Sequence, residues 1–314
     1  MCNIFNYQNG KMILLKLFFL SIFYRFFHIK LLDKIKVCIC TIGKRENKYA
    51  REFVEYYKNR GINKIFIYDN NEINDEKFDA ILKDYISEGS VKIIDFRGIL
   101  APQVKAMEDC RKHFYKKYNW LIFYDMDEYL YLRNFSNIPD FLNQKKFDKC
   151  QRIQLNWFFH TDNNLIYYDN RSLVERFPEK DKRWNNIKIG GFEGIKSILK
   201  GNINIEINDA HVLNKKLISC DGFGNIKEIL NIITNESDHY YYYIDHYYSK
   251  STEEFVNKLL RGSVAYGNIT EHYLRRIRVY FALNGMSLEK INYIENKTAL
   301  NLTEYRIKLS NLTK

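Results

Sequence analysis

The stretch Leu121-Ile122-Phe123-Tyr124-Asp125-Met126-Asp127-Glu128 decides how this chain is interpreted. An apolar run from Trp120 to Tyr124 is typical of a buried strand, and it ends in three carboxylates. Residues i and i+2 of an extended backbone point to the same side, so Asp125 and Asp127 can approach one divalent cation together. Mg²⁺ and Mn²⁺ accept carboxylate oxygens, and such a cation can hold a diphosphate and neutralise its charge. The motif predicts a metal site, although a solvated turn has the same pattern.

Alternating strand and helix patterns surround this motif. Strands are expected at 36–41, 64–68, 91–95, 120–124, 150–158 and 195–200, and helices at 45–59, 78–88, 103–118 and 252–260. Ser251 and Glu254 form a capping box at the start of the last helix. Short connections between strands and helices predict an α/β fold with a mostly parallel central sheet flanked by helices. Such sheets bind ligands at the carboxyl ends of their strands, which is where the acidic motif falls.

The chain divides by sequence pattern into three parts. Residues 33–265 are expected to form the catalytic domain, and residues 266–314 a C-terminal helical extension. Residues 1–32 are apolar and basic, and the charged residues Lys16 and Arg25 interrupt the apolar run. A spanning helix needs about 20 mostly apolar residues, so we expect either a helix lying in a membrane interface or a helix packed on the domain.

Composition bounds the partners and the compartment. The formal net charge is +11, spread along the chain, and suits anionic small substrates, nucleic acid or an anionic membrane equally. The 6 cysteines show no paired metal-binding spacing, and we expect all of them to be reduced thiols. The predicted location is therefore cytoplasmic, with peripheral contact at a membrane surface as an option.

Five blocks in the order expected for one family carry a resemblance. They are GINKIFIYDNN, WLIFYDMDEYL, LNWFFHTDNN, GIKSILKG and IDHYYSKSTEEFVNKLLRG. Together they cover roughly residues 36–262 and resemble glycosyltransferase family 92. That resemblance implies a GT-A-like fold, an Asp-x-Asp (DxD) metal site holding Mn²⁺ or Mg²⁺, and a UDP-sugar donor. It further implies inverting transfer of a hexose, with UDP-galactose as the donor, to a glycan or glycolipid acceptor.

The resemblance also implies roles for individual residues. Thr41 and Glu46 follow the first strand, where a GT-A enzyme meets its nucleotide, and Asp69 and Asn70 end the second strand, where uracil or ribose binds. Those last two residues also make a good turn without any ligand. Gln103 matches a glutamine near the donor.

Basic residues complete the predicted donor and metal sites. His246 stands in the His-Tyr pair before the last helix and is the expected third metal ligand, beside Asp125 and Asp127. Lys196 and Arg261 are candidates for the diphosphate.

Inversion requires a general base that deprotonates the acceptor hydroxyl. Asp162 and Glu193 both lie in loop-like sequence after the metal motif and are the candidates, with no ranking between them. Trp157 either stacks on a sugar or belongs to the core.

Two other functions compete with the transferase. A nucleic-acid-binding protein would need basic and aromatic residues gathered on one face or a recognisable module, and the sequence has neither, so no nucleic-acid partner is expected. A metal-dependent phosphoesterase would draw carboxylates and histidines from several strands, and the first three strand ends offer few.

Overall fold

The computed structural model describes residues 35–181, 194–227, 238–262 and 269–298, together with residues 300 and 302. The account below concerns the unit Lys36–Lys314. The predicted N-terminal segment, residues 1–32, lies outside the described residues. Within the described residues, no helix is long and apolar enough to cross a membrane.

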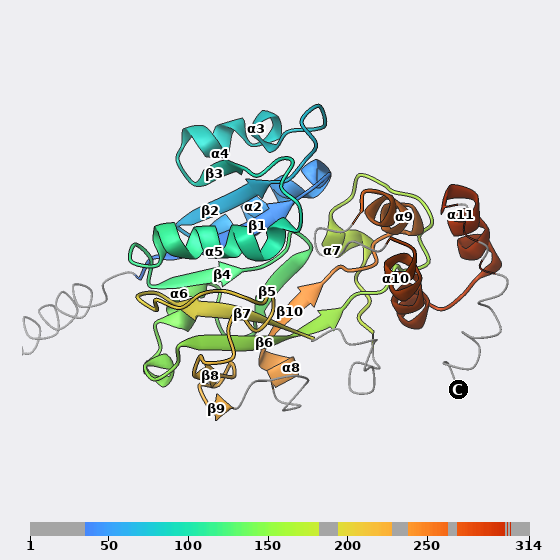
Figure 1. The fold of residues 1–314 in the computed structure, drawn as a ribbon. Helices are drawn as coiled ribbons and strands as arrows, with labels where there is room; N and C mark the ends of the chain where they lie inside the picture. The colour runs from blue at the N-terminus through green and yellow to red at the C-terminus, as the bar shows by residue number, and fades with distance from the viewer. Residues whose placement is uncertain are drawn as a thin grey trace, which may run out of the picture. The chain divides into compact units, whose positions relative to one another are not determined.

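A single mixed sheet organises the described part of the chain (Figure 1). Its strand order is β3-β2-β1-β4-β7-β6-β10-β5, and β8 and β9 extend it beside β6. The strands are β1 (Val37–Gly43), β2 (Lys64–Asp69), β3 (Val91–Asp95), β4 (Trp120–Phe123), β5 (Glu128–Leu132), β6 (Arg152–Phe159), β7 (Ile195–Lys200), β8 (Ser219–Cys220), β9 (Ile226–Lys227) and β10 (Tyr242–His246).

The first four strands form the parallel part of the sheet. β1 lies between β2 and β4 and is parallel to both, and β2 pairs in parallel with β3. Gly43 at the end of β1 is in register with Asp69 at the end of β2. β7 then joins β4 in the antiparallel direction, whereas β10 runs parallel to β6. The α/β fold with helices flanking a central sheet, expected from the sequence, is confirmed; β1 to β4 form its parallel half, and the other half is mixed.

Helices flank this sheet and follow it toward the C-terminus. They are α2 (Asn47–Asn59), α3 (Phe78–Ile81), α4 (Lys83–Ser87), α5 (Pro102–Phe114), α6 (Ile138–Leu142), α7 (Leu173–Arg176), α8 (Asp238–Tyr241), α9 (Thr252–Leu260), α10 (Ile269–Asn284) and α11 (Leu288–Thr298), with a 3-10 turn at Lys145–Phe147. The single helix expected at 78–88 is divided at Leu82, whose φ of −115° is not helical.

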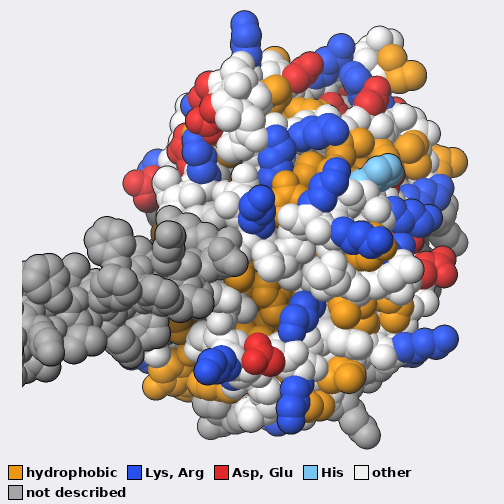
Figure 2. All heavy atoms as spheres, turned by 90° about the vertical axis from the view of Figure 1, so that its left-hand side faces the viewer, with side chains coloured by type: hydrophobic (Ala, Val, Ile, Leu, Met, Phe, Trp, Pro, Cys, Tyr) orange, Lys and Arg blue, Asp and Glu red, His pale blue; other side chains and the backbone are white. Residues whose placement is uncertain are grey.

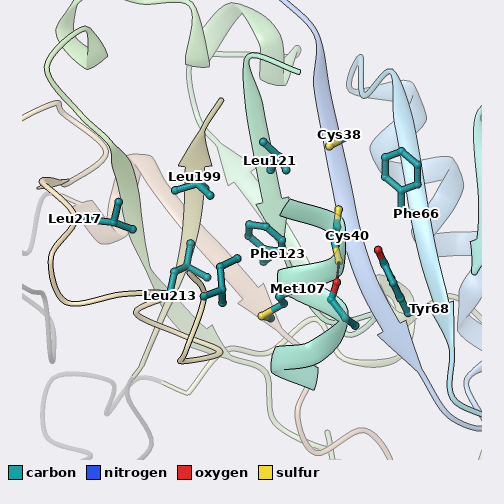
Figure 3. Close-up of a cluster of buried hydrophobic side chains, with 13 residues drawn as sticks. Cys38, Cys40, Phe66, Tyr68, Met107, Leu121, Phe123, Leu199, Leu213 and Leu217 are labelled. Carbon is teal, nitrogen blue, oxygen red and sulfur yellow. Dashed lines mark hydrogen bonds between the residues drawn. The ribbon is translucent and has the colours of Figure 1, made fainter. Parts of the chain in front are cut away.

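Helix α5 covers one face of the parallel strands (Figure 1). Its apolar residues Ala106, Met107 and Cys110 pack on alternate residues of the strands, among them Cys38 and Cys40. Figure 3 shows Cys40 and Met107 beside Phe123, with Phe66, Tyr68 and Leu121 on the neighbouring strands of the same cluster. The period-two alternation of β1 thus presents its small cysteine side chains to the helix.

Helix α2 is fixed against β5, the strand that follows the acidic motif. Phe53 and Tyr57 are fully buried, and the ring of Phe53 lies 6.1 Å from that of Tyr129. The Tyr57 hydroxyl donates to the backbone oxygen of Glu128 at 2.8 Å. This contact holds the start of β5, and with it the backbone that leaves Asp127.

Helices α9, α10 and α11 form a second apolar core beyond the end of β10 (Figure 1). Phe255 of α9 stacks on Tyr280 of α10 with ring centroids 4.2 Å apart, and Ile294 of α11 is fully buried in the same cluster. The capping box expected at Ser251 and Glu254 is present at the start of α9. The helical extension therefore fixes α9, whose side chains reach the acidic motif.

A disulfide joins Cys150 to Cys220, which are 70 positions apart in the chain, and so connects the segment before β6 to β8. The prediction that all cysteines are reduced is wrong for this pair, because β6 and β8 are neighbouring parallel strands in the sheet. Cys38, Cys40 and Cys110 are buried free thiols.

Lysine and arginine side chains are scattered over the face drawn in Figure 2, with apolar and acidic side chains between them.

Candidate functional site

The carboxyl ends of β1, β2 and β4 carry the polar residues singled out in the sequence. Thr41 lies in β1 with its side chain buried, Asp69 is the last residue of β2, and Asp125 follows β4 by two residues. Because these strands are parallel neighbours, their carboxyl ends meet at one edge of the sheet.

Asp125 is held by one residue from a helix and one from a strand. Gln103, in the first turn of α5, donates from Nε2 to one carboxylate oxygen at 3.1 Å. Lys196 of β7 donates from Nζ to the other oxygen at 2.8 Å. Burial would raise the pKa of Asp125, but the charge of Lys196 lowers it, so the group is an anion at neutral pH. Its side chain keeps 31% of its exposure, and a ligand can therefore reach it.

The buried side chain of Glu128 contacts both Asp125 and Lys196. Its carboxylate accepts from the Asp125 amide at 3.0 Å and lies 3.5 Å from Lys196 Nζ, and its side chain has no exposure. Burial raises the pKa of Glu128 well above its usual range, and the charges of Asp125 and Asp127 add to the effect. We regard Glu128 as a buried group that orients the Asp125 backbone.

Asp127 is surrounded by basic groups from the C-terminal half of the chain. One oxygen lies 2.7 Å from Lys258 Nζ and 3.9 Å from Lys250 Nζ, and the other lies 3.6 Å from His246 Nε2. Burial would raise the pKa of Asp127, yet the charges of Lys258 and Lys250 lower it far below its usual range. Asp127 is thus a buried, permanently ionised carboxylate.

The His246 ring lies among aromatic side chains. Its centroid is 4.5 Å from that of Trp157 and 5.2 Å from that of Phe159. Burial lowers the pKa of His246 to about 3, although the charge of Asp127 opposes the shift, so the ring is neutral at pH 7. Trp157 is only 5% exposed and supports the ring from the core side.

The chemistry of these side chains suits a divalent cation. Ionised carboxylates and a neutral imidazole are acceptable ligands for Mn²⁺, and the Nδ1 atom of His246 has no hydrogen-bond partner in the described part of the chain. Within those described residues, no group of three or more His, Cys, Asp or Glu side chains is arranged as a metal cage. Asp125 and Asp127 each contact different lysines instead. The predicted trio of Asp125, Asp127 and His246 stays a prediction.

Glu46 is joined to the same cluster. It follows β1 and its carboxylate contacts Arg261 Nη2 at 2.5 Å and Lys250 Nζ at 3.4 Å. Burial would raise the pKa of Glu46, but Arg261 and Lys250 lower it. The structure therefore forms two groups at this sheet edge. Gln103 and Lys196 contact Asp125. His246 and Lys250 contact Asp127, and Lys250 also contacts Glu46, which is paired with Arg261.

Asp69 and Asn70 make backbone contacts in the loops beside β1. Asp69 accepts from the Asn71 amide at 3.0 Å, and Asn70 donates from Nδ2 to the oxygen of Phe96 at 2.8 Å. These contacts shape a turn, as the sequence alternative proposed. Asp69 and Asn70 lie next to the end of β1. Within the described residues they form no hydrogen bond with Gln103, Asp125 or Lys196, and their contact with a nucleotide stays a prediction. Thr41 Oγ1 likewise has no partner among the described side chains.

The two candidates for the general base fall in different positions. Asp162 is buried and its carboxylate contacts Lys290 Nζ at 2.7 Å and the Tyr280 hydroxyl at 2.6 Å. These partners come from α11 and α10, so Asp162 connects the loop after β6 to the helical extension. Glu193 lies outside the described residues.

Lys250 and Lys258 are site residues that the sequence analysis did not single out. Lys258 and Arg261 are three residues apart around the end of α9, a spacing that puts two side chains on one helix face. This spacing, in the helix that follows His246, is a sequence feature from which Lys258 could have been predicted as a site residue. Lys250 has no comparable signal in the sequence, since its left-handed backbone, with φ of 54°, is visible only in the structure.

The edge of the parallel sheet thus gathers an Asp-x-Asp pair, a glutamine at a helix start and several lysines into one candidate site. A model of glycosyltransferase family 92 matches residues 33–201, slightly more than half of the chain. This chain belongs to glycosyltransferase family 92. The matched segment includes Gln103, Asp125, Asp127 and Lys196, whereas Lys258 lies beyond it.

Curated relatives match over shorter stretches. A glycosyltransferase family 92 protein of Ricinus communis is 30% identical over 109 residues, which are 33% of this chain and 19% of the relative. A family 92 protein of Oryza sativa subsp. japonica is 26% identical over 110 residues, 34% of this chain and 18% of the relative. The aligned stretch is thus less than a fifth of either relative.

Solved structures of S. aureus TarS resemble the chain distantly. TarS 1-349 has 14% identity and a TM-score of 0.37, with 88% of this chain and 86% of that chain covered. The same protein in complex with UDP-GlcNAc has 14% identity and a TM-score of 0.38, covering 84% and 79%.

Proposed function

We propose that this protein is a metal-dependent glycosyltransferase. It moves a hexose from a UDP-sugar, with UDP-galactose as the donor, to a glycan or glycolipid acceptor, and it inverts the anomeric configuration. Family membership supports glycosyl transfer. The donor, the acceptor, the metal and the stereochemistry are our proposals.

The observation that carries this proposal is the placement of two ionised aspartates among cations at one sheet edge. Asp125 keeps 31% of its side-chain exposure, and Asp127 contacts three basic groups. Such a mixture of charges suits a ligand that itself combines negative phosphate with a positive metal ion. A site for a neutral ligand would leave these charges without function.

We propose that Asp125, Asp127 and His246 hold the metal, because carboxylates and a neutral imidazole are ligands that Mn²⁺ accepts. Bound there, Mn²⁺ or Mg²⁺ would act as a Lewis acid that neutralises the charge developing on the departing diphosphate. Lys196, Lys258 and Arg261 supply further positive charge within the same region. Gln103 orients Asp125 through its hydrogen bond at 3.1 Å.

The proposed nucleotide is UDP, with Asp69 and Asn70 at the end of β2 as its readers, and with Thr41 and Glu46 nearby on β1 and its following loop. Parallel neighbours β1 and β2 support this placement, because Gly43 and Asp69 are in register. The general base remains open between Asp162 and Glu193.

Calorimetry with UDP, GDP, ADP and CMP, in Mn²⁺ and then in EDTA, tests the donor and the metal separately. We expect UDP to bind most tightly and its affinity to fall sharply in EDTA, because the two aspartates repel a diphosphate without an intervening cation. Binding that ignores EDTA would contradict the metal role. A preference for GDP would contradict the UDP proposal and leave the metal untouched.

Matched variants separate site binding from general effects. Asp127→Asn should lose metal-dependent UDP binding, whereas Asp79→Asn on the exposed surface of α3 should retain it. Turnover of UDP-galactose, UDP-glucose and UDP-N-acetylhexosamines against a glycan library then tests the sugar and the acceptor. Equal turnover of all donors would contradict galactose specificity.

The place of action is proposed to be cytoplasmic, with peripheral contact at a membrane surface. Co-sedimentation of the full chain with anionic vesicles tests the membrane contact.

A further inference from the structure

Asp127 has more cations around it than one carboxylate can satisfy. Lys258 and Lys250 approach the same oxygen, at 2.7 and 3.9 Å, while His246 faces the other. Asp127 is only 6% exposed in its side chain, so these cations have little water to share the charge. A cation entering this site must therefore compete with one already present.

The three nearby cations differ in how firmly other groups hold them. Arg261 is fixed by Glu46 at 2.5 Å and also donates to the backbone oxygen of Lys44. Lys250 is shared with Glu46 at 3.4 Å and lies 3.5 Å from the centre of the Tyr49 ring. Both side chains have anchors that do not depend on Asp127.

Lys258 is the least anchored of the three. Beyond Asp127 it has a contact of 3.5 Å to the backbone oxygen of Tyr248 and a ring contact of 4.9 Å to the same residue. It stands in the last turn of α9, and its side chain is 15% exposed, against 3% for Lys250. A long, flexible side chain at the rim of the site can reach a ligand without moving the helix.

We propose that Lys258 is an exchangeable counter-ion, bound to Asp127 in the ligand-free protein and transferred to an anionic phosphate when a divalent cation replaces it on Asp127. This inference rests on the proposed function. The exchange keeps every ionic group paired: the ammonium leaves one anion for another, and no bond is made or broken. The divalent cation and the phosphate therefore bind together, because the cation takes the place of Lys258 on Asp127 and the phosphate becomes the new partner of Lys258.

The exchange has a signature that a structural role lacks. Removing the ammonium frees Asp127 for a cation but deprives the phosphate of a partner, so the two affinities should move in opposite directions. A lysine that only maintains the fold would change both in the same direction or neither.

Lys258→Met in the full chain tests this exchange through two binding measurements. Mn²⁺ alone is titrated by the electron paramagnetic resonance signal of the free ion, and UDP is titrated by calorimetry at saturating Mn²⁺. We expect Mn²⁺ to bind about tenfold more tightly than to the unaltered protein, and UDP about tenfold more weakly. Lys258→Arg, which keeps the charge, should restore both affinities toward their original values.

Lys290→Met is the matched control, because Lys290 forms another buried lysine–aspartate pair, at 2.7 Å to Asp162. We expect it to leave the Mn²⁺ affinity unchanged. If Lys258→Met does not fold, Lys258→Gln replaces it, since the amide can still donate a hydrogen bond to Asp127 without a charge, and the same opposite changes are expected.

Parallel losses of both affinities, or an unchanged Mn²⁺ affinity, would overturn the exchange while leaving the transferase proposal standing. If the unaltered protein binds neither Mn²⁺ nor UDP, the proposed function fails and the exchange fails with it.

Discussion

Two buried lysine–aspartate pairs in this molecule have the same contact length but different surroundings. Lys258 lies 2.7 Å from Asp127, and Lys290 lies 2.7 Å from Asp162. Around Asp162 each polar group has a suitable partner: Tyr280 donates to the carboxylate, and Lys290 also donates to the oxygens of Asn164 and Asn284. Around Asp127, two lysines and a histidine compete for one carboxylate.

This difference separates a pair that maintains the fold from one that is available for exchange. A buried ion pair stabilises a protein when further hydrogen bonds satisfy both partners. The Asp162 pair meets that condition and connects the loop after β6 to α10 and α11. The Asp127 pair does not meet that condition, because two lysines and a histidine contact one carboxylate. The additional positive charge can pair with an anionic ligand.

The largest effect is expected from Asp162→Ala. Removing this carboxylate leaves Lys290 buried without a countercharge, which should lower the free energy of unfolding by about 3–5 kcal/mol. Urea denaturation measures the loss, and the double variant Asp162→Ala with Lys290→Met should recover part of it. Normal stability with abolished transfer would instead identify Asp162 as the general base and end the contrast between the two pairs.

Asp127→Ala should act on turnover more than on stability. We expect at least about a hundredfold loss of transfer, equivalent to several kcal/mol of transition-state stabilisation, and a smaller loss for Asp125→Ala. The protein should stay folded at the assay temperature, because Lys258 is 15% exposed and can turn toward water. Steady-state kinetics and a thermal melt of the same samples check this expectation. Turnover at the original rate in both variants would remove the metal site.

His246→Gln should weaken Mn²⁺ binding by about tenfold. Alanine is a poor test at this position, because the ring packs against Trp157 and Phe159 and its loss would leave a cavity. Glutamine fills more of that space. An unchanged Mn²⁺ affinity with a lower melting temperature would make His246 a core residue and leave the aspartates alone on the cation.

The smallest effect concerns pH and the His211 ring beside Trp157. Burial, with the nearby charge of Lys196, lowers the pKa of His211 to about 4. As the pH falls, the His211 ring is protonated near pH 6.5 in the unfolded chain but only near pH 4 in the folded protein. The free energy of unfolding therefore decreases as the pH falls through this range. His211→Gln should recover about 1 kcal/mol at pH 5.5 relative to pH 7, measured by denaturation at both values. An identical pH dependence in both proteins would show that other groups govern it.

Much of the fold was readable from local pattern because strands and helices depend on nearby residues. The expected strand at 91–95 coincides with β3, and the strand expected at 195–200 coincides with β7. Asp125 was singled out from its position at a strand end, whereas Gln103 was named through the family resemblance. The structure places Gln103 and Lys196 in contact with Asp125.

Lys250 and Lys258 were missed because long-range strand pairing places them. His246 is opposite Glu128 in the antiparallel pair of β10 and β5, and that register brings the following loop and α9 to Asp127. Nothing in the local pattern around Asp127 names a partner more than a hundred residues later. The sequence analysis does not predict strand β5, because it interprets the acidic motif as the end of one strand. In the structure the motif connects β4 to β5.

The Cys150–Cys220 bond has a consequence for where the chain can mature. Closing a loop of 70 residues stabilises a folded protein by about 4 kcal/mol in the chain-entropy description. Such bonds persist in oxidising compartments, whereas cytosolic glutathione keeps thiols reduced. The disulfide therefore favours an oxidising compartment and disagrees with the predicted cytoplasmic location. A producing cell with a reducing interior would deliver the chain without this cross-link. Alkylation of free thiols inside the intact native cell, before lysis exposes the protein to air, would therefore report whether Cys150 and Cys220 are bonded there.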